Sequence, residues 1–207
     1  MSRRRHSRTC PAILERELHQ LGYRFIAGVD EVGRGAWAGP VVAAAVILNL
    51  DQIPEGIDDS KRLSPRRREE LFSAIGNTAR ALSIGIVDAW EIDRTNILRA
   101  TERAMTQAIE GLRVRPDFLL IDAVELLDVE VPQRALIRGD QLSVSIAAAS
   151  IIAKVTRDRL MREYDRLYPG YGFAHHVGYG TRAHREALMR LGPCPIHRRS
   201  FRGVLLK

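Results

Sequence analysis

Runs of apolar residues bounded by glycine or proline mark the expected strands of this chain. β-branched and apolar residues continue almost unbroken over 25–30 and 41–48, a composition typical of buried strands. A glycine-rich link, 33–40, joins these two runs. Three further strands are expected at 81–87, 118–121 and 133–137.

Helical periodicity fills the intervals between these strands. Apolar residues recur at helical spacing in 11–21, 88–112 and 143–167, and each range is expected to form a helix. Pro65 suits the first turn of another helix, for which Ser64 supplies the N-cap. The order of elements predicts an α/β domain built on a mixed five-stranded sheet that is flanked by helices.

The length of 207 residues suits one domain with a small appended lobe. Residues 1–22 are expected to form a basic arm and a short helix, and 23–207 the main domain. The Pro/Gly-rich stretch 168–179 predicts that a small helical C-terminal extension begins near residue 168. The arm is interpreted either as a phosphate contact or as a solvated tail, and its arginines are Arg3, Arg4, Arg5 and Arg8.

Charge and cysteine content narrow the class of protein. The net charge is +7, from 32 Lys and Arg against 25 Asp and Glu, which favours a polyanionic partner. No apolar run approaches the roughly 18–20 residues of a membrane span, and no signal-peptide core follows the basic start, so we expect a cytoplasmic protein. Cys10 and Cys194 sit in no zinc-binding array and are expected to be free thiols.

Four carboxylates follow apolar runs at the ends of expected strands or turns. Asp30 and Glu31 close the strand FIAGVDEVG, Asp122 ends LLID, and Asp140 ends IRGD. Adjacent acids after a buried strand are costly unless they are solvated or bind a cation. Oxygen ligands in a basic protein indicate a site for Mg²⁺ or Mn²⁺, and two such ions suit phosphodiester hydrolysis.

For any single acid, a structural role is the simpler interpretation. Asp140 follows Gly139 and would then cap the helix that begins near Leu142. The adjacent Asp30 and Glu31, followed at once by Gly-Arg-Gly, make this interpretation weaker for the set. The remaining loop and helix-start acids are interpreted as solvated: Asp51, Asp58, Asp88, Asp93, Asp128 and Glu130.

Several motifs resemble those of the ribonuclease HII family. They are GVDEVGRGAWAGPVVAAAV from Gly28, DDSKRLS from Asp58, LLIDA from Leu119, GDQLSVSIAAASIIAKVTRD from Gly139 and HHVGYGT from His175. They occur in consistent order over about 25–185. The resemblance implies an RNase H-like fold, a C-terminal helical extension and a monomer.

The resemblance also implies roles for individual residues. The four catalytic, metal-binding acids fall on Asp30, Glu31, Asp122 and Asp140. Glycines permit close backbone approach, and the Gly33, Arg34 and Gly35 element would read the 2′-hydroxyl at an RNA–DNA junction. Tyr179 would stack beside the cut. Basic positions expected to hold phosphates are Lys61, Lys154 and Arg157.

Two features of the C-terminal third depart from this pattern or lie outside it. Relatives usually carry Lys where this chain has Val177. The change is expected to affect affinity for nucleic acid more than catalytic activity, because it does not touch the acids. His175, His176, His184 and His197 are interpreted as residues of turns near a nucleic-acid surface rather than as metal ligands or acid–base catalysts. Three nearby arginines either extend a phosphate track or form a solvated tail: Arg198, Arg199 and Arg202.

The resulting hypothesis is an endoribonuclease that cuts the RNA strand of RNA/DNA hybrids. It would also incise DNA 5′ of embedded ribonucleotides, through two divalent ions, leaving 5′-phosphate and 3′-hydroxyl ends. A junction-resolvase-like nuclease of the same fold and a nucleic-acid-binding module without chemistry stay open as alternatives. The C-terminal segment 201–207 contains no glutamine-plus-aromatic clamp motif, so a clamp or polymerase partner stays unknown.

Overall fold

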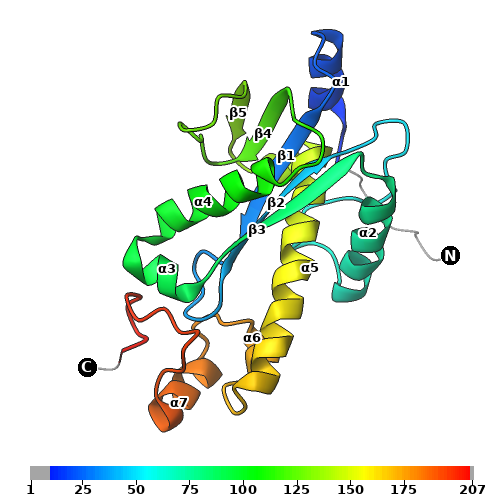
Figure 1. The fold of residues 1–207 in the computed structure, drawn as a ribbon. Coiled ribbons are helices and arrows are strands. Elements are labelled where there is room, and N and C mark those ends of the chain that lie inside the picture. The colour runs from blue at the N-terminus through cyan, green and yellow to red at the C-terminus, as the bar shows by residue number, and fades with distance from the viewer. Residues whose placement is uncertain (1–9, 206–207) are drawn as a thin grey trace, which may run out of the picture.

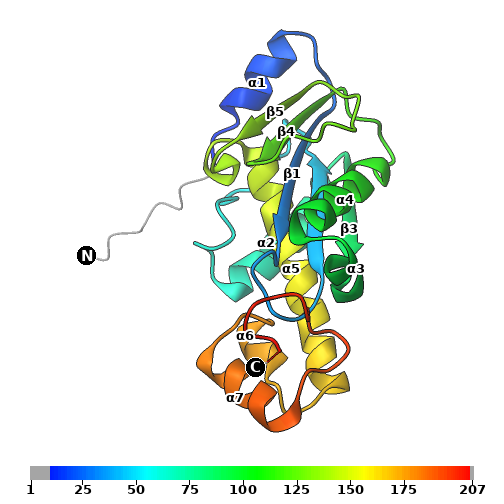
Figure 2. The same ribbon diagram turned by 90° about the vertical axis from the view of Figure 1, so that its left-hand side faces the viewer.

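The computed structural model describes residues 10–205 (Figures 1 and 2). The arginines predicted to form the start of an N-terminal arm, at 3–8, lie outside the described residues. So do the last two residues of the C-terminal segment 201–207. No helix among the described residues is long and apolar enough to cross a membrane.

A mixed five-stranded sheet forms the centre of the molecule, with strand order β3-β2-β1-β4-β5. β1 pairs antiparallel with β2, and β2 with β3, whereas β1 and β4, and β4 and β5, are parallel. The predicted strands and the mixed sheet are therefore confirmed. Their bounds are Ile26–Val32, Val41–Ile47, Ala81–Val87, Phe118–Asp122 and Gln133–Leu136 for β1 to β5.

The helices agree with the periodicity except at one position. The predicted helix over 88–112 is two helices, because Asn96 turns out of the helix and its side chain accepts a hydrogen bond from the Arg99 amide. Ser64 caps α2 as predicted. The bounds are Ile13–Gln20, Pro65–Thr78, Ala89–Arg94, Ile97–Glu110, Val144–Leu167, Phe173–His176 and Arg182–Leu191 for α1 to α7.

Helices cover both faces of the sheet. Figure 2 shows α4 on one face of β1 and α5 on the other. Ala27 and Val29 belong to the apolar cluster on the α4 side, whereas the α5 side packs against Val42, Ala44 and Val46 of β2. Residues of β2 therefore alternate between two buried layers, since Val41, Ala43, Ala45 and Ile47 belong to the cluster on the α4 side.

α5 approaches β1 unusually closely at Gly28. A Cβ built on Gly28 would lie 2.0 Å from the Ser145 carbonyl carbon, so only glycine lets the first turn of α5 lie against the strand. This contact places the start of α5, and the turn before it, beside β1.

A small helical lobe follows α5. α6, α7 and the chain beyond them gather at the C-terminal end of α5, next to the link between β1 and β2 (Figures 1 and 2). Its own apolar cluster includes Phe173, Leu188 and Met161, the last contributed by α5. Cys194 in this lobe and Cys10 are both free, as predicted, and both are buried.

Candidate active site at the ends of the central strands

Asp30 and Asp122 come together through strand pairing. β1 and β4 are parallel with Val29 opposite Ile121, so the next residue on each strand is an acid. Asp30 is buried, and its carboxylate accepts a hydrogen bond of 2.7 Å from the Glu31 amide. Asp122 accepts one of 2.7 Å from the Gly139 amide, which ties the end of β4 to the turn that carries Asp140.

Asp140 lies in a short 3-10 turn, Gly139–Gln141, directly before α5. The alternative that it caps the following helix is wrong, because the Ser143 side chain caps α5 by accepting from the Ile146 amide. Buried Glu15 of α1 supports this junction by accepting from the Ser143 hydroxyl and the Ser145 amide. The side chain of Asp140 is thereby left for the acidic cluster.

Glu31 follows Asp30 near the end of β1. It occupies the opposite face of β1 from Asp30 in the strand alternation, yet the charge of Asp122 still acts on it. Its Oε1 lies 3.5 Å from an Arg34 nitrogen. Its Oε2 is buried and has no hydrogen-bond partner among the described residues, as expected of an oxygen that a cation would satisfy.

Burial and mutual repulsion oppose ionisation in this cluster. Burial raises the pKa of Asp30 well above its ordinary value, and the charges of Glu31 and Asp122 raise it further. Burial, with the charges of Asp59 and Asp122, raises the pKa of Asp140 to about 6. Such a group of carboxylates favours a divalent cation, which removes the repulsion.

Within 10–205, no group of three or more His, Cys, Asp or Glu side chains is arranged so that it could hold a metal ion. Repelling carboxylates without a cation are expected to stand apart, and Mg²⁺ keeps several waters and uses only one or two carboxylates directly. The all-oxygen donor set, its raised pKa values and the unsatisfied oxygen of Glu31 therefore fit hard divalent cations.

The loop before α2 brings a fifth acid that the sequence interpretation missed. Asp59 is buried, and its carboxyl group shares a hydrogen bond with Asp140. It also accepts from the Lys61 amide at 2.9 Å, which fixes the turn. Partial burial lowers the pKa of Lys61, but the acids around it, Asp140 most strongly, raise it overall. Only the closeness of Asp59 to Lys61 in the DSK motif could have indicated its position.

The Gly-Arg-Gly element follows directly from β1. Gly33 has φ of +96°, and a Cβ there would lie 2.2 Å from the Arg157 Nε, so glycine is required on both counts. The nearest atom to a Cβ on Gly35 would belong to the Tyr179 ring, at 4.0 Å. Tyr179 is 38% exposed. The two predicted recognition elements therefore lie side by side, and the Tyr179 ring is open to a ligand.

The predicted phosphate-binding role of Arg157 does not fit its position. Its guanidinium is buried and donates to the carbonyls of Pro40, Ala38 and Val177, so no face is left for a phosphate. Lys154 is half-buried and pairs with Asp158 at 2.6 Å. Of the three predicted basic residues, Lys61 alone is exposed and lies within the field of the acids.

The histidine interpretation also needs correction. His184 and His197 are buried rather than in surface turns, and their Nε2 atoms lie 3.0 Å apart. Burial lowers the pKa of each to about 4, so both are neutral at physiological pH. Arg198 is buried as well, which excludes it from a phosphate track, whereas Arg199 and Arg202 are exposed.

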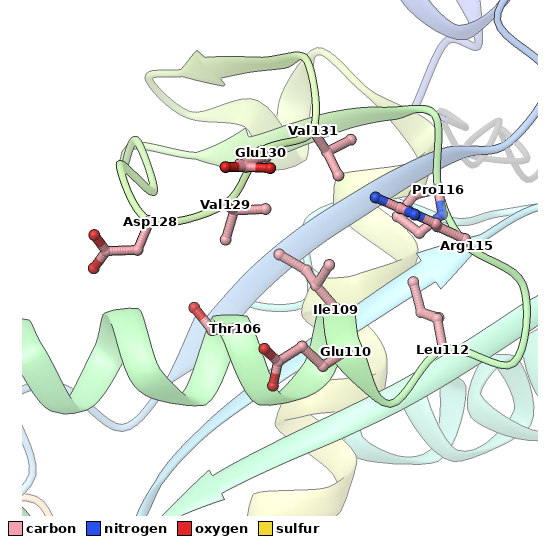
Figure 3. A pocket seen from close by; sticks show the side chains of 10 residues that line it. All are labelled: Thr106, Ile109, Glu110, Leu112, Arg115, Pro116, Asp128, Val129, Glu130 and Val131. Atoms are coloured by element: carbon pink, nitrogen blue, oxygen red, sulfur yellow. The ribbon is translucent and has the colours of Figure 1, made fainter.

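A recess of about 530 Å³ lies elsewhere, between α4 and the loop that joins β4 to β5. Figure 3 shows Val129 and Val131 pointing from this loop toward Ile109 of α4. Its lining contains none of the predicted site residues: Thr106, Ile109, Glu110, Leu112, Arg115, Pro116, Asp128, Val129, Glu130 and Val131. The acids therefore lie apart from this recess.

Comparison with known proteins agrees with this geometry. The family model described as Ribonuclease HII matches residues 27–204. The chain is 58% identical to ribonuclease HII of Geobacter sulfurreducens over 183 residues, which cover 88% of this chain and 84% of the relative. The chain belongs to the ribonuclease HII family. Its membership makes it a nuclease of the ribonuclease H type.

Solved ribonuclease HII structures share the fold. Ribonuclease H2 from Pyrococcus horikoshii OT3 has a TM-score of 0.73 at 29% identity, with 87% of this chain and 95% of that chain covered. RNase HII from Archaeoglobus fulgidus, solved in complex with PCNA, has a TM-score of 0.74 at 27% identity and covers 86% and 95%. The α/β architecture of the present ribonuclease HII is thus RNase H-like.

Proposed function

We propose that this ribonuclease HII hydrolyses the RNA strand of RNA/DNA hybrids and incises DNA 5′ of embedded ribonucleotides. The supporting observation is that Glu31 of the acidic cluster, the Gly33–Gly35 element and the Tyr179 ring follow one another around the end of β1. A carboxylate that would hold a catalytic cation is thereby adjacent to groups suited to reading a sugar. The products would carry 5′-phosphate and 3′-hydroxyl ends, and the enzyme would act as a monomer.

Asp30, Glu31, Asp122 and Asp140 would hold the divalent cations. Two Mg²⁺ or Mn²⁺ ions bound there would supply a water of lowered pKa and stabilise charge on the phosphate and the leaving oxygen. Two of these acids are already held in place by the fold: Asp30 is buried, and Asp122 accepts a hydrogen bond from the Gly139 amide. Asp59, hydrogen-bonded to Asp140, orients that carboxylate.

Recognition of the ribonucleotide would be divided between backbone and ring. Gly33 and Gly35 carry no side chain that would keep a sugar away from the backbone, so the peptide groups of this element suit hydrogen bonding to a 2′-hydroxyl. Tyr179 would stack on the sugar or base step beside the cut. Lys61 would hold a nearby phosphate, and Lys154 would do so only by exchanging its partner Asp158.

The test is cleavage of a labelled DNA duplex that contains one ribonucleotide, beside an all-DNA duplex, with Mg²⁺ and with EDTA. We expect Mg²⁺-dependent incision immediately 5′ of the ribonucleotide and no cut in the control. Asp122→Asn should abolish cleavage and leave binding nearly intact, because the asparagine oxygen still accepts from the Gly139 amide. Wild-type rate in this variant would remove Asp122 from the site.

The same experiment separates the alternatives. Cleavage of both duplexes would favour a resolvase-like nuclease, which does not depend on the 2′-hydroxyl. Tight binding without cleavage of either would favour a binding module. The second outcome is opposed by the acids themselves, since uncompensated carboxylates beside a phosphate backbone repel it.

A further inference from the structure

The segment Cys194–Phe201 lies against the β1–β2 link, far away in sequence. Ala38 and His197 form an isolated antiparallel bridge. The Arg198 amide donates to the Trp37 carbonyl at 2.8 Å, and the Gly39 amide donates to the Ile196 carbonyl at 2.9 Å. Figure 2 shows the red C-terminal segment beside the blue link. The C-terminal lobe is therefore joined to the link that begins with Gly33–Gly35.

Arg198 holds this link from beneath. Its side chain is fully buried, and it donates to the carbonyls of Arg34 at 2.9 Å and Gly39 at 3.0 Å. Its second terminal nitrogen is buried and has no hydrogen-bond partner in the described part of the chain. A buried guanidinium without a counter-ion is costly, and the two carbonyls together with the Phe201 ring, whose centroid lies 5.1 Å from the Arg198 Cζ, offset part of that cost.

His197 reaches the other recognition element through a second histidine. The Cys194 amide donates to His197 Nδ1 at 2.9 Å, so the His197 proton belongs on Nε2 and is donated to His184 Nε2 at 3.0 Å. His184 Nδ1 then donates to the Tyr179 carbonyl at 3.0 Å. This series of hydrogen bonds assigns one tautomer to each imidazole ring, and it ends on the backbone carbonyl of Tyr179.

Two consecutive residues thus hold the two halves of the recognition surface. Arg198 fixes the carbonyl inside the Gly-Arg-Gly element, and His197 fixes the residue whose ring lies against Gly35. The Gly178 carbonyl, next to Tyr179, also accepts from the Trp37 and Ala38 amides of the link. A shift of either residue would change the spacing between Gly35 and the Tyr179 ring.

We propose that His197 and Arg198 are positioning residues that set the spacing between the Gly33–Gly35 backbone and Tyr179, and so determine discrimination for a single ribonucleotide. The proposal rests on the proposed function, in which those two elements read the 2′-hydroxyl. A misplacement of about 1 Å in such a site costs on the order of 100-fold in rate. Hybrid cleavage, in which every position of one strand offers a 2′-hydroxyl, is expected to suffer less.

The experiment compares kcat/KM on a duplex with one ribonucleotide and on an RNA/DNA hybrid. Arg198→Met keeps the buried stem and removes both donors, and Arg199→Met is the control, an exposed arginine one residue away. We expect Arg198→Met to lose about 10- to 100-fold on the single ribonucleotide and no more than about 3-fold on the hybrid. Arg199→Met should leave the ratio of the two unchanged.

Salt dependence separates positioning from phosphate binding. Loss of a phosphate contact lowers the slope of log K against log salt by about 1 and weakens both substrates alike. Arg198→Met is expected to leave that slope unchanged, since the side chain is buried. Equal loss on both substrates, or a slope reduced by about 1, would overturn the proposal.

His197 is tested by partial rescue. His197→Ala should reduce the same ratio, and His197→Gln, which keeps a donor and an acceptor, should restore part of it. Unfolding midpoints are measured for each variant, and Arg198→Lys, which keeps the charge but not the two-carbonyl geometry, covers the case in which the methionine variant does not fold. If discrimination is lost in Arg198→Lys and His197→Ala only near the temperature at which each variant unfolds, and returns well below that temperature, the two residues act through stability alone. The proposal is then overturned.

Tyr179→Ala distinguishes failure of this inference from failure of the proposed function. If Tyr179→Ala keeps full discrimination, the assigned recognition role is wrong and this proposal falls with it. If Tyr179→Ala loses discrimination and Arg198→Met does not, only the positioning role is wrong. In the expected result the two effects are not additive in the double variant, because Arg198 acts through the same surface as Tyr179.

Discussion

Asp140→Asn should make the metal-free protein more stable and the enzyme inactive. Asp140 is 6% exposed, lies beside Asp59 and Asp122, and has a pKa raised to about 6. Asparagine resembles the protonated acid in size, and its amide can donate to Asp59 where the acid proton did. The substitution therefore removes a charge that the fold disfavours and keeps the local contacts.

The magnitude follows from the shift in pKa. An acid whose pKa is higher in the folded state loses stability as pH rises from its ordinary value of 3.8 through about 6. A shift of that size corresponds to about 3 kcal/mol at high pH, and partial hydration of the carboxylate reduces this to about 1–2 kcal/mol. Loss of a cation ligand should lower the cleavage rate on the order of 1000-fold or more.

The assay is urea unfolding in EDTA, near pH 8 and near pH 4, paired with cleavage of the single-ribonucleotide duplex. We expect Asp140→Asn to unfold at higher urea than wild type near pH 8, and no difference near pH 4, where Asp140 is already protonated. Asp128→Asn, an exposed acid beside the separate recess, is the matched control and should change neither quantity. A variant less stable than wild type near pH 8 would refute the reasoning about repulsion.

Two further predictions concern the C-terminal lobe. Val177 has φ of +43°, a left-handed conformation that is strained for a β-branched residue, and its carbonyl is held by Arg157. Val177→Lys should raise stability by about 1 kcal/mol, seen as a higher urea midpoint at unchanged m-value, and steepen the salt dependence of hybrid binding by about 1; a lower midpoint would mean that packing of the valine outweighs the strain. The lowered pKa values of His184 and His197 contribute stability that is present above their ordinary value of 6.5 and lost as pH falls toward about 4. The double variant His184→Gln, His197→Gln should therefore show a smaller loss of stability than wild type between pH 6.5 and 4, and an identical loss would contradict the assignment.

Strands and helices were predictable because each follows from a local pattern. Four of the five strands match apolar runs, and the more polar β5 falls within the fifth predicted range, 133–137. Ser64 is a residue type with a strong N-cap preference, and it caps α2. The break at Asn96 was missed because the apolar period continues through it while the asparagine side chain satisfies a new helix start. A polar residue with a strong capping preference is as informative there as the apolar spacing.

The acids were predictable as a set, but their partners were not. The sequence allowed Asp30 and Asp122 to be predicted as neighbours because both end apolar strands. The parallel pairing of β1 and β4 does bring them together. Asp59 joins Asp140 only through tertiary packing of the loop before α2, for which no local pattern exists. Arg157 and Arg198 show the same limit, because nothing local distinguishes an arginine that binds phosphate from one that binds backbone carbonyls.

The placement of charge in this enzyme gives a physical reason for the separate C-terminal lobe. Carboxylates at the strand ends repel one another and need cations to offset that repulsion. The buried guanidiniums of Arg157 and Arg198 instead donate hydrogen bonds to backbone carbonyls. Because carbonyls are neutral, these two cations can stiffen the β1–β2 link without introducing acids that would compete for metal or repel a phosphate backbone. Their uncompensated positive charge also lies beneath the surface that would meet a polyanion, which favours binding there. Neutral histidines complete the same support, since at physiological pH they donate directed hydrogen bonds without adding a charge that would oppose the two guanidiniums.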